Sequence, residues 1–293
     1  IGLSLVGSEM CIRDSLRTDI AIDFLNKKED ESPFFLFMSY RAPHSFEGPI
    51  RDTLLYADKG WPEIERVHAA KITLLDKQVG RLLEKLKEIN QLDNTLILFT
   101  SDNGPHYAKD GHELEFFDSN GQFKGGKRDL YEGGIRVPLI AYWDQNILPG
   151  SVSNHVSSFQ DIMPTFSEII GFENVHDTDG ISFLPTLLSK RQKKHKFLNW
   201  EFQLSGWFQT IPNGGFRQSV RLENWKAVRY NLNSDIELYN LKNDPGETKN
   251  IAKLHPNIIN RADSIFKISR TDATGFPYGG VKQNYKSMDV YDF

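Results

Sequence analysis

The sequence predicts an α/β fold with a mostly parallel sheet flanked by helices, followed by a smaller C-terminal antiparallel α+β subdomain. Three continuous apolar runs of strand length, residues 34–40, 95–100 and 137–143, suit strands that are covered on both faces. A helical pattern separates the first two runs, and this strand–helix–strand order is typical of a parallel sheet. From residue 197 onward, short segments alternate apolar and polar residues between turns, which indicates an antiparallel sheet.

The helix predicted over residues 67–89 is the strongest element of the first part. Charged residues fill its second face, and a shorter helix is expected at 19–26. Residues 161–170 predict another helix, which begins at the capping residue Asp161 and stops at Gly171. The apolar positions of the 67–89 helix recur at three- and four-residue steps: Ile72, Leu75, Val79, Leu82, Leu83, Leu86 and Ile89.

The C-terminal part begins after a basic linker at residues 190–196. We therefore place a domain boundary there, with one domain over 16–192 and the other over 193–293. Four strands, followed by a helix at 258–268, are expected in the second domain. The four predicted strands are 197–202, 217–222, 225–230 and 236–241.

Composition excludes several classes of protein. The 293 residues carry 35 Lys and Arg against 39 Asp and Glu, so the formal net charge of −4 gives no basic footprint for nucleic acid. No apolar run approaches the roughly 18–20 residues needed to span a membrane. The single cysteine, Cys11, excludes an intramolecular disulfide framework and a cysteine-based zinc site.

The first fifteen residues are treated separately. The chain opens at Ile1, and residues 1–15 have neither strand alternation nor a helical stripe, and no basic region before the apolar part. They do not predict a signal peptide. We expect them to be a foreign leader joined near Leu16, and we exclude them from the predicted fold.

Asp102 and Asn103 directly follow the predicted strand at 95–100. In open α/β sheets, ligands bind outside the carboxyl ends of the strands. A carboxylate and an amide oxygen are hard ligands suited to Ca²⁺ or Mg²⁺. The alternative is an Asx turn, in which Asp102 accepts a hydrogen bond from a nearby backbone N–H.

Two further groups lie in loops after predicted elements. His44 follows the strand at 34–40 and can donate to an oxyanion or protonate a leaving oxygen; the alternative is a surface histidine. Lys127 follows Gly125 and Gly126, which permit close approach of the backbone to an anion; the alternative is a solvated basic loop. The chain has no GxxxxGK[ST] motif, so a phosphate P-loop is excluded.

Several longer strings resemble the type I, formylglycine-dependent sulfatases. They occur in the order and at the spacing of that family, and the resemblance covers residues 16 to about 254. The block from Lys127 to Pro138 is highly specific. The strings are SDNGPH at 101–106, KRDLYEGGIRVP at 127–138, SFQDIMPTFSEIIG at 158–171 and NDPGETKNIA at 243–252.

This resemblance implies an incomplete alkaline-phosphatase-like fold and the hydrolysis of sulfate esters. In the family, a cysteine or serine is oxidised to formylglycine, which attacks sulfur, and one Ca²⁺ holds the sulfate oxygens. The implied calcium ligands are Asp102 and Asn103. The implied sulfate contacts are Lys127 and His44, with His44 near the ester oxygen as a proton donor.

The resemblance also has gaps. The family's Cys/Ser-x-Pro/Ala-x-Arg nucleophile motif is absent from the 293 residues, and Cys11 lacks its spacing. The family's Asp-Asp calcium pair and the Lys and His that follow the nucleophile are absent as well. We therefore expect a fragment, with residues 16–192 as a partial catalytic domain, that is inactive by itself. Loss of a nucleophile costs on the order of 10⁵–10⁶ in rate.

The substrate side is less specified. His106, His112 and Arg128 share loops with the implied site and are candidates for substrate binding; the alternative is that they face solvent. Aromatic residues near Trp200, with Arg217 and Arg221, either shape the leaving-group subsite or pack between the subdomains.

A sulfated carbohydrate is favoured over a small aryl sulfate, and the resemblance implies a periplasmic or secreted protein. Two alternatives stay open. One is a phosphatase or phosphodiesterase of the same fold, although these more often place a histidine where Asn103 stands. The other is a catalytically dead remnant. The sequence specifies no oligomeric state.

Overall fold

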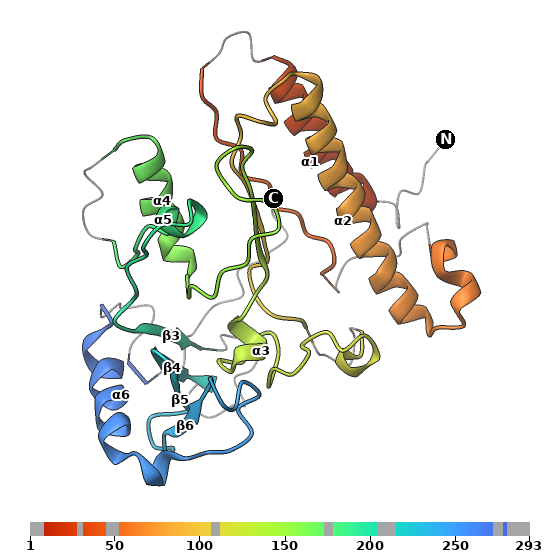
Figure 1. Ribbon diagram of the computed structural model, residues 1–293. Helices are drawn as coiled ribbons and strands as arrows, with labels where there is room; N and C mark the ends of the chain where they lie inside the picture. Colours follow the sequence, from red (N-terminus) through yellow and green to blue (C-terminus); the bar gives the residue numbers. More distant parts are fainter. Residues whose placement is uncertain are drawn as a thin grey trace. The chain divides into compact units, whose positions relative to one another are not determined.

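The chain forms two compact units. The structure, a computed structural model, describes residues 9–27, 32–44, 53–106, 112–172, 178–203, 215–271 and 278–279 (Figure 1). Unit 1 comprises Ile1–Thr100, His106–Ser119 and Leu139–Ile147, and unit 2 comprises Ser101–Pro105, Asn120–Pro138 and Leu148–Phe293. The unit that contains the C-terminal sheet therefore also contains the segments with Asp102 and Lys127.

Two long helices, α1 (Glu9–Asn26) and α2 (Glu63–Glu88), lie side by side in unit 1 (Figure 1). The Arg81 guanidinium of α2 donates to the Asp19 carboxylate of α1 and ties the two helices together. The predicted helix at 67–89 is confirmed, and it begins four residues earlier, directly after Pro62. Pro62 is the N-cap, and its ψ of 147° lies outside the helical region, so the helix begins at the next residue. A short 3₁₀ helix, η1 (Thr53–Lys59), precedes α2.

The exclusion of residues 1–15 from the fold is corrected for the part from Glu9 onward. Helix α1 begins at Glu9, ten residues before the predicted start. Asp14 is buried, and its carboxylate accepts hydrogen bonds from the backbone N–H groups of Arg41, at 3.2 Å, and Ala42, at 2.9 Å. A buried carboxylate that satisfies backbone donors 27 and 28 residues away is a folded feature of this chain.

The sheet of unit 1 differs from the prediction. Strands β1 (Ile97–Thr100) and β2 (Leu139–Tyr142) lie within two predicted strands, but they pair antiparallel, with Thr100 opposite Leu139. Parallel pairing would need a crossover back to the start of β1. The chain instead leaves β1 at Thr100 and enters β2 directly opposite, at Leu139, so the intervening segment joins the two strands at the same end. A mostly parallel sheet is therefore wrong for the described strands.

The third apolar run, 34–40, belongs to no helix and no sheet among the described residues. Its side chains alternate between half-buried and exposed, and Phe35 and Phe37 are 70% and 79% exposed. The prediction of a doubly covered strand is thus wrong here. Apolar composition predicts extended backbone, but it does not supply a neighbouring strand.

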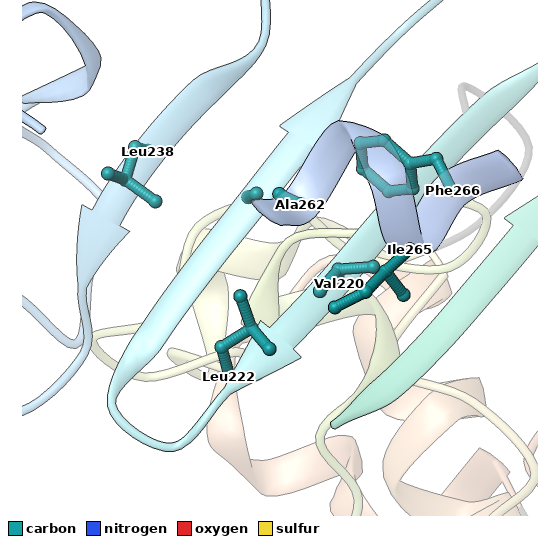
Figure 2. Packing of buried hydrophobic residues seen from close by; sticks show 7 residues of the cluster. Val220, Leu222, Leu238, Ala262, Ile265 and Phe266 are labelled. Atoms are coloured by element: carbon teal, nitrogen blue, oxygen red, sulfur yellow. The ribbon is translucent and has the colours of Figure 1, made fainter. Parts of the chain in front are cut away.

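The predicted C-terminal sheet is confirmed. Its four strands pair antiparallel in chain order, and α6 (Pro256–Ile268) follows where a helix was predicted. One face of the sheet packs on α6, with Val220, Leu238 and Phe266 at the centre of the cluster (Figure 2). The strands are β3 (Leu198–Phe202), β4 (Arg217–Leu222), β5 (Trp225–Arg229) and β6 (Glu237–Asn240).

The opposite face of this sheet is covered by the segment that follows Lys127. Leu130 and Tyr131 pack on Val228 of β5 and Tyr239 of β6. Because side chains alternate along a strand, Ala227 points to α6 while Val228 points to this segment. The sheet therefore joins α6 to the candidate site loop within one unit.

Short helices complete the described residues. Asp161 is fully buried at the start of α4, where its carboxylate accepts from the backbone N–H groups of Ser158 and Ile181. The predicted capping of this helix by Asp161 is corrected, because Asp161 precedes α4 but makes no side-chain cap hydrogen bond to it. Its carboxylate instead completes a capping box with Ser158 at the preceding 3₁₀ turn. No helix in the described part of the chain is both long and apolar enough to cross a membrane. The short helices are η2 (Leu114–Phe116), α3 (Glu132–Ile135), η3 (Phe159–Asp161), α4 (Ile162–Ile169), α5 (Leu184–Leu187) and η6 (Ala252–Leu254).

Truncation of the core on α6 tests this packing. Phe266→Ala should lower the free energy of unfolding of unit 2 by about 3–5 kcal/mol, because it leaves a cavity between helix and sheet. Ile268→Ala, on the same helix but 75% exposed, is the matched control and should change it by less than about 0.5 kcal/mol. Urea unfolding followed by circular dichroism measures both, and equal losses would contradict the packing described.

Candidate active site

The turn after β1 presents Asp102 and Asn103. Asp102 is exposed, and none of the described residues donates a hydrogen bond to its carboxylate. The Asx-turn alternative therefore does not hold. The Asn103 Nδ2 donates to the Gly104 carbonyl at 2.9 Å, which fixes the amide and leaves its Oδ1 as the atom available to a cation.

Lys127 is anchored to the same turn. Its backbone N–H donates to the Pro105 carbonyl at 2.7 Å, and the ammonium is half-buried. Burial lowers the pKa of Lys127, the Asp102 carboxylate opposes that change, and Arg128 adds to it. The backbone hydrogen bond from Lys127 to Pro105 places the Lys127 loop against the turn that carries Asp102 and Asn103.

The backbone at Lys127 is held by Asp129. The Asp129 carboxylate accepts from the Gly126 N–H at 3.2 Å, the Arg217 guanidinium at 2.9 Å and the Tyr230 hydroxyl at 3.0 Å. A Cβ on Gly125 would lie 2.7 Å from this carboxylate, and Gly125 has a φ of +77°. Gly125 therefore makes room for the Asp129 carboxylate. The sequence alone predicts instead that Gly125 makes room for a ligand.

Both loops pack on the short helix α3. The Gly104 N–H donates to the Gly134 carbonyl, and the Gly133 N–H donates to the Lys124 carbonyl, each at 2.9 Å. A Cβ on Gly104 would lie 1.9 Å from the Gly133 oxygen, so no side chain fits there. Helix α3 therefore fixes the Asp102 turn relative to the Lys127 loop.

Helix α3 is itself anchored to the C-terminal sheet by Glu132. This carboxylate is buried, and it lies 3.0 Å from the Lys226 ammonium, 3.4 Å from the Arg221 guanidinium and 3.6 Å from that of Arg136. Burial raises the pKa of Glu132, but the three cations together outweigh that effect and hold the pKa below its ordinary value. Glu132 is therefore ionised and bridges the loop to β4 and β5.

The residues considered for a leaving-group subsite have other partners. Arg217 donates to Asp129 and to the Arg128 carbonyl, and Arg221 bonds to Glu132. Trp200 packs beside Val228 on the face of the sheet that meets α3. Arg128 adopts a φ of +78°, which places it at the turn beside Lys127.

His44 and His106 belong to unit 1. His44 closes a turn in which its N–H donates to the Arg41 carbonyl, and its own carbonyl accepts from the buried Lys71 ammonium at 2.9 Å. Helix α2 thus holds the His44 backbone. His106 directly follows Pro105, the residue that accepts from Lys127, and is half-buried.

His112 is buried in a cluster against α2. Its ring stacks on His68 with centroids 3.7 Å apart, and its Nδ1 lies 3.5 Å from the Glu65 carboxylate. Burial, together with His112 and Lys71, lowers the pKa of His68 to about 4. His112 therefore packs inside unit 1, contrary to the expectation that it lines a substrate pocket.

The donors available to a metal are oxygen atoms. Among the described residues, no group of three or more His, Cys, Asp or Glu side chains could hold a metal ion. Asp102 and Asn103 form a two-residue set of hard donors, which fits Ca²⁺ better than a nitrogen- or sulfur-preferring metal.

Sequence reasoning missed the supporting charges Glu132, Lys226 and Glu247. Glu247 is buried and accepts a hydrogen bond from the Glu132 N–H at 2.7 Å. One signal in the sequence was available. Lys226 lies between Trp225 and Ala227 in a predicted strand, so its side chain had to point to the face of the sheet opposite theirs. Its partner, 94 residues away, left no local mark on the sequence.

Two family models match the chain. The Sulfatase model matches residues 10–172, more than half of the chain, and the model described as N-sulphoglucosamine sulphohydrolase, C-terminal, matches residues 119–262. A solved structure of i-CgsB in complex with k-i-k-neocarrahexaose superposes with a TM-score of 0.72 at 26% identity, covering 85% of this chain and 52% of that one.

Curated relatives agree with the family models. The chain is 30% identical over 287 residues to the uncharacterised sulfatase YdeN of Escherichia coli K12, covering 87% of this chain and 50% of the relative. It is also 30% identical over 250 residues to human N-acetylgalactosamine-6-sulfatase, covering 78% of this chain and 46% of the relative. The chain thus spans about half the length of these relatives. With the matched fold and the loops around Asp102 and Lys127, it belongs to the sulfatase family.

Proposed function

We propose that the protein of which these residues form part hydrolyses sulfate esters. The observation that carries this proposal is that the Asp102 turn and the Lys127 loop are joined by backbone hydrogen bonds, from Lys127 to Pro105 and from Gly104 to Gly134 of α3. An anionic oxygen ligand beside a half-buried cation suits a divalent metal that shares an anionic substrate with the lysine. Membership of the sulfatase family supports sulfate as that anion.

Each residue has a role in this proposal. Asp102 and Asn103 would hold Ca²⁺, and Lys127 would neutralise the charge that develops on the sulfuryl and leaving oxygens. His44 would donate the proton to the leaving alcohol, and His106 and Arg128 would contact the substrate. When bound, Ca²⁺ supplies Lewis-acid stabilisation and formylglycine supplies the nucleophile.

A sulfated carbohydrate is the substrate class that we propose. The human relative is named for N-acetylgalactosamine 6-sulfate, and the C-terminal family model is named for N-sulphoglucosamine. The similar solved structure holds an oligosaccharide. We also propose a periplasmic or secreted location, as the family resemblance implies.

Calcium binding tests the metal half of the proposal. Calorimetric titration of the 293-residue chain with CaCl₂ should give a binding signal that Asp102→Ala lowers at least about tenfold, since a carboxylate ligand is lost. Asp235→Ala, an exposed aspartate of unit 2, is the control and should bind as the wild type does. With Ca²⁺ present, inorganic sulfate should bind more weakly to Lys127→Ala.

Two results would contradict this assignment. Wild-type affinity for Ca²⁺ in Asp102→Ala would remove Asp102 from the site. Stoichiometric zinc in the purified protein would favour a phosphatase or phosphodiesterase, because zinc prefers nitrogen ligands over the Asp–Asn set.

Turnover by the isolated chain is a separate prediction. The 293 residues contain no Cys/Ser-x-Pro/Ala-x-Arg motif, so we expect no measurable hydrolysis of a fluorogenic aryl sulfate. Activity that His44→Ala abolishes would contradict this expectation while supporting the role of His44. The gene sequence upstream of the codon for Glu9, where α1 begins, is the companion measurement, and an in-frame motif there would identify the nucleophile.

A further inference from the structure

Glu247 combines three properties that a surface turn residue does not need. Its φ is +52°, in the left-handed region that L-residues with side chains rarely adopt. Its side chain is only 1% exposed, although it is a carboxylate. The turn around it is also confined, because a Cβ on Gly246 would lie 2.8 Å from the Gln122 carbonyl. Strain and burial of this kind persist only where surrounding contacts impose them.

The contact that accounts for this arrangement is to α3. The Glu247 Oε2 accepts from the Glu132 backbone N–H at 2.7 Å. Glu132 is the first residue of α3, and the residue before it, Tyr131, gives no side-chain cap. The first N–H groups of a helix have no partner within the helix. Glu247 therefore supplies, from the C-terminal subdomain, the acceptor that the local sequence does not.

What α3 holds in turn is the candidate site. Its backbone bonds to Gly104, next to Asp102 and Asn103, and to Lys124, three residues before Lys127. The contacts at Gly104 leave no room for even one methyl group, so a shift of α3 must move the Asp102 turn. A single hydrogen bond, donated by the Glu132 N–H and accepted by Glu247, thus acts on both halves of the site.

We propose that Glu247 is a positioning residue of the active site, which holds the Asp102 turn and the Lys127 loop in register by accepting the Glu132 N–H. The catalytic meaning of this inference rests on the proposed function, whereas the mechanical coupling does not. Glu247 acts through α3, by the hydrogen bond that it accepts from the Glu132 N–H.

The coupling should depend on pH. Burial raises the pKa of Glu247 to about 7, and the nearby Glu132 carboxylate acts in the same direction. Three groups oppose this rise in the pKa: the Lys226 and Lys124 ammonium groups and the Glu132 N–H. Arg221 is a further nearby cation. The folded chain thus binds this proton more tightly than the unfolded chain does. The contribution of Glu247 to the free energy of unfolding is therefore fully present below the ordinary carboxyl pKa, and it is lost as the pH rises through about 7.

Hydrogen–deuterium exchange of the 293-residue chain tests the inference. In Glu247→Ala, peptides covering 101–106 and 124–135 should exchange at least about tenfold faster, while peptides from β3 to β6 stay as in the wild type. Glu223→Ala is the matched control, because Glu223 also has a positive φ, of 54°, but is exposed. It should change exchange in neither segment by more than about twofold.

Glu247→Gln supplies the readout that a merely structural role would not move. After correction for intrinsic rates, the wild type should lose protection in these two segments between pH 6 and pH 8. The neutral glutamine variant should show the same protection at both values. If Glu247→Ala unfolds the chain, this pH comparison decides the question.

Two results would overturn the inference. One is wild-type exchange at 101–106 in a folded Glu247→Ala chain. The other is an unchanged pH dependence in Glu247→Gln. Titration with CaCl₂ separates this inference from the proposed function: faster exchange in a chain whose wild type binds no Ca²⁺ would retain the coupling and remove the metal site.

Discussion

The buried ion pair between Glu132 and Lys226 is the contact on which the candidate site depends. Both side chains lie almost wholly out of solvent, with their charged atoms 3.0 Å apart. Desolvating two charges costs several kcal/mol for each ion, so such a pair persists only where geometry and further hydrogen bonds compensate. Arg221 and Arg136 supply further positive charge to the Glu132 carboxylate, and Glu247 accepts from its backbone N–H. The pair therefore specifies where α3 lies.

The C-terminal sheet serves two purposes through strand alternation. Its apolar residues, such as Val220 and Leu238, face α6 and supply hydrophobic stability (Figure 2). Its opposite face presents Arg217, Arg221 and Lys226 to the segment that carries Lys127. Because neighbouring residues of a strand point to opposite faces, one face of the sheet stabilises the subdomain and the other positions the Lys127 segment. The subdomain that the sequence set apart is, in the structure, the support of the candidate site.

Local patterns predicted the elements well where the pattern itself determines the structure. The helix at 67–89 and the four C-terminal strands have a clear period, and both are confirmed. The run at 34–40 has no period, so its sequence could not say whether a strand lies beside it. The antiparallel pairing of β1 with β2 was missed for a related reason, because the sequence between the two strands carries no local sign of the end at which the chain returns to the sheet.

The candidate site was predictable only in part. The position of Asp102 after a strand, with the family resemblance, was enough to place Asp102 and Lys127 together. The charges beneath them were not predictable, because Glu132, Lys226 and Glu247 meet across 94 and 115 residues of chain. Such pairs depend on tertiary packing, and one sequence alone carries no sign of it. His112 is the opposite case: it was predicted from its loop to contact substrate, but its ring is buried and stacks on His68.

A double-mutant cycle between Glu132 and Lys226 measures the central contact most directly. Glu132→Gln should lower the free energy of unfolding by about 3–5 kcal/mol, because it leaves the buried Lys226 charge without its carboxylate partner. Lys226→Met should lower it by less, because Glu132 keeps its longer contacts to Arg221 and Arg136. The double variant should lose less than the sum, with a coupling energy of about 1–3 kcal/mol. Losses that add to within about 0.5 kcal/mol would show that the two charges do not act on one another, and would contradict this account of how the site is held.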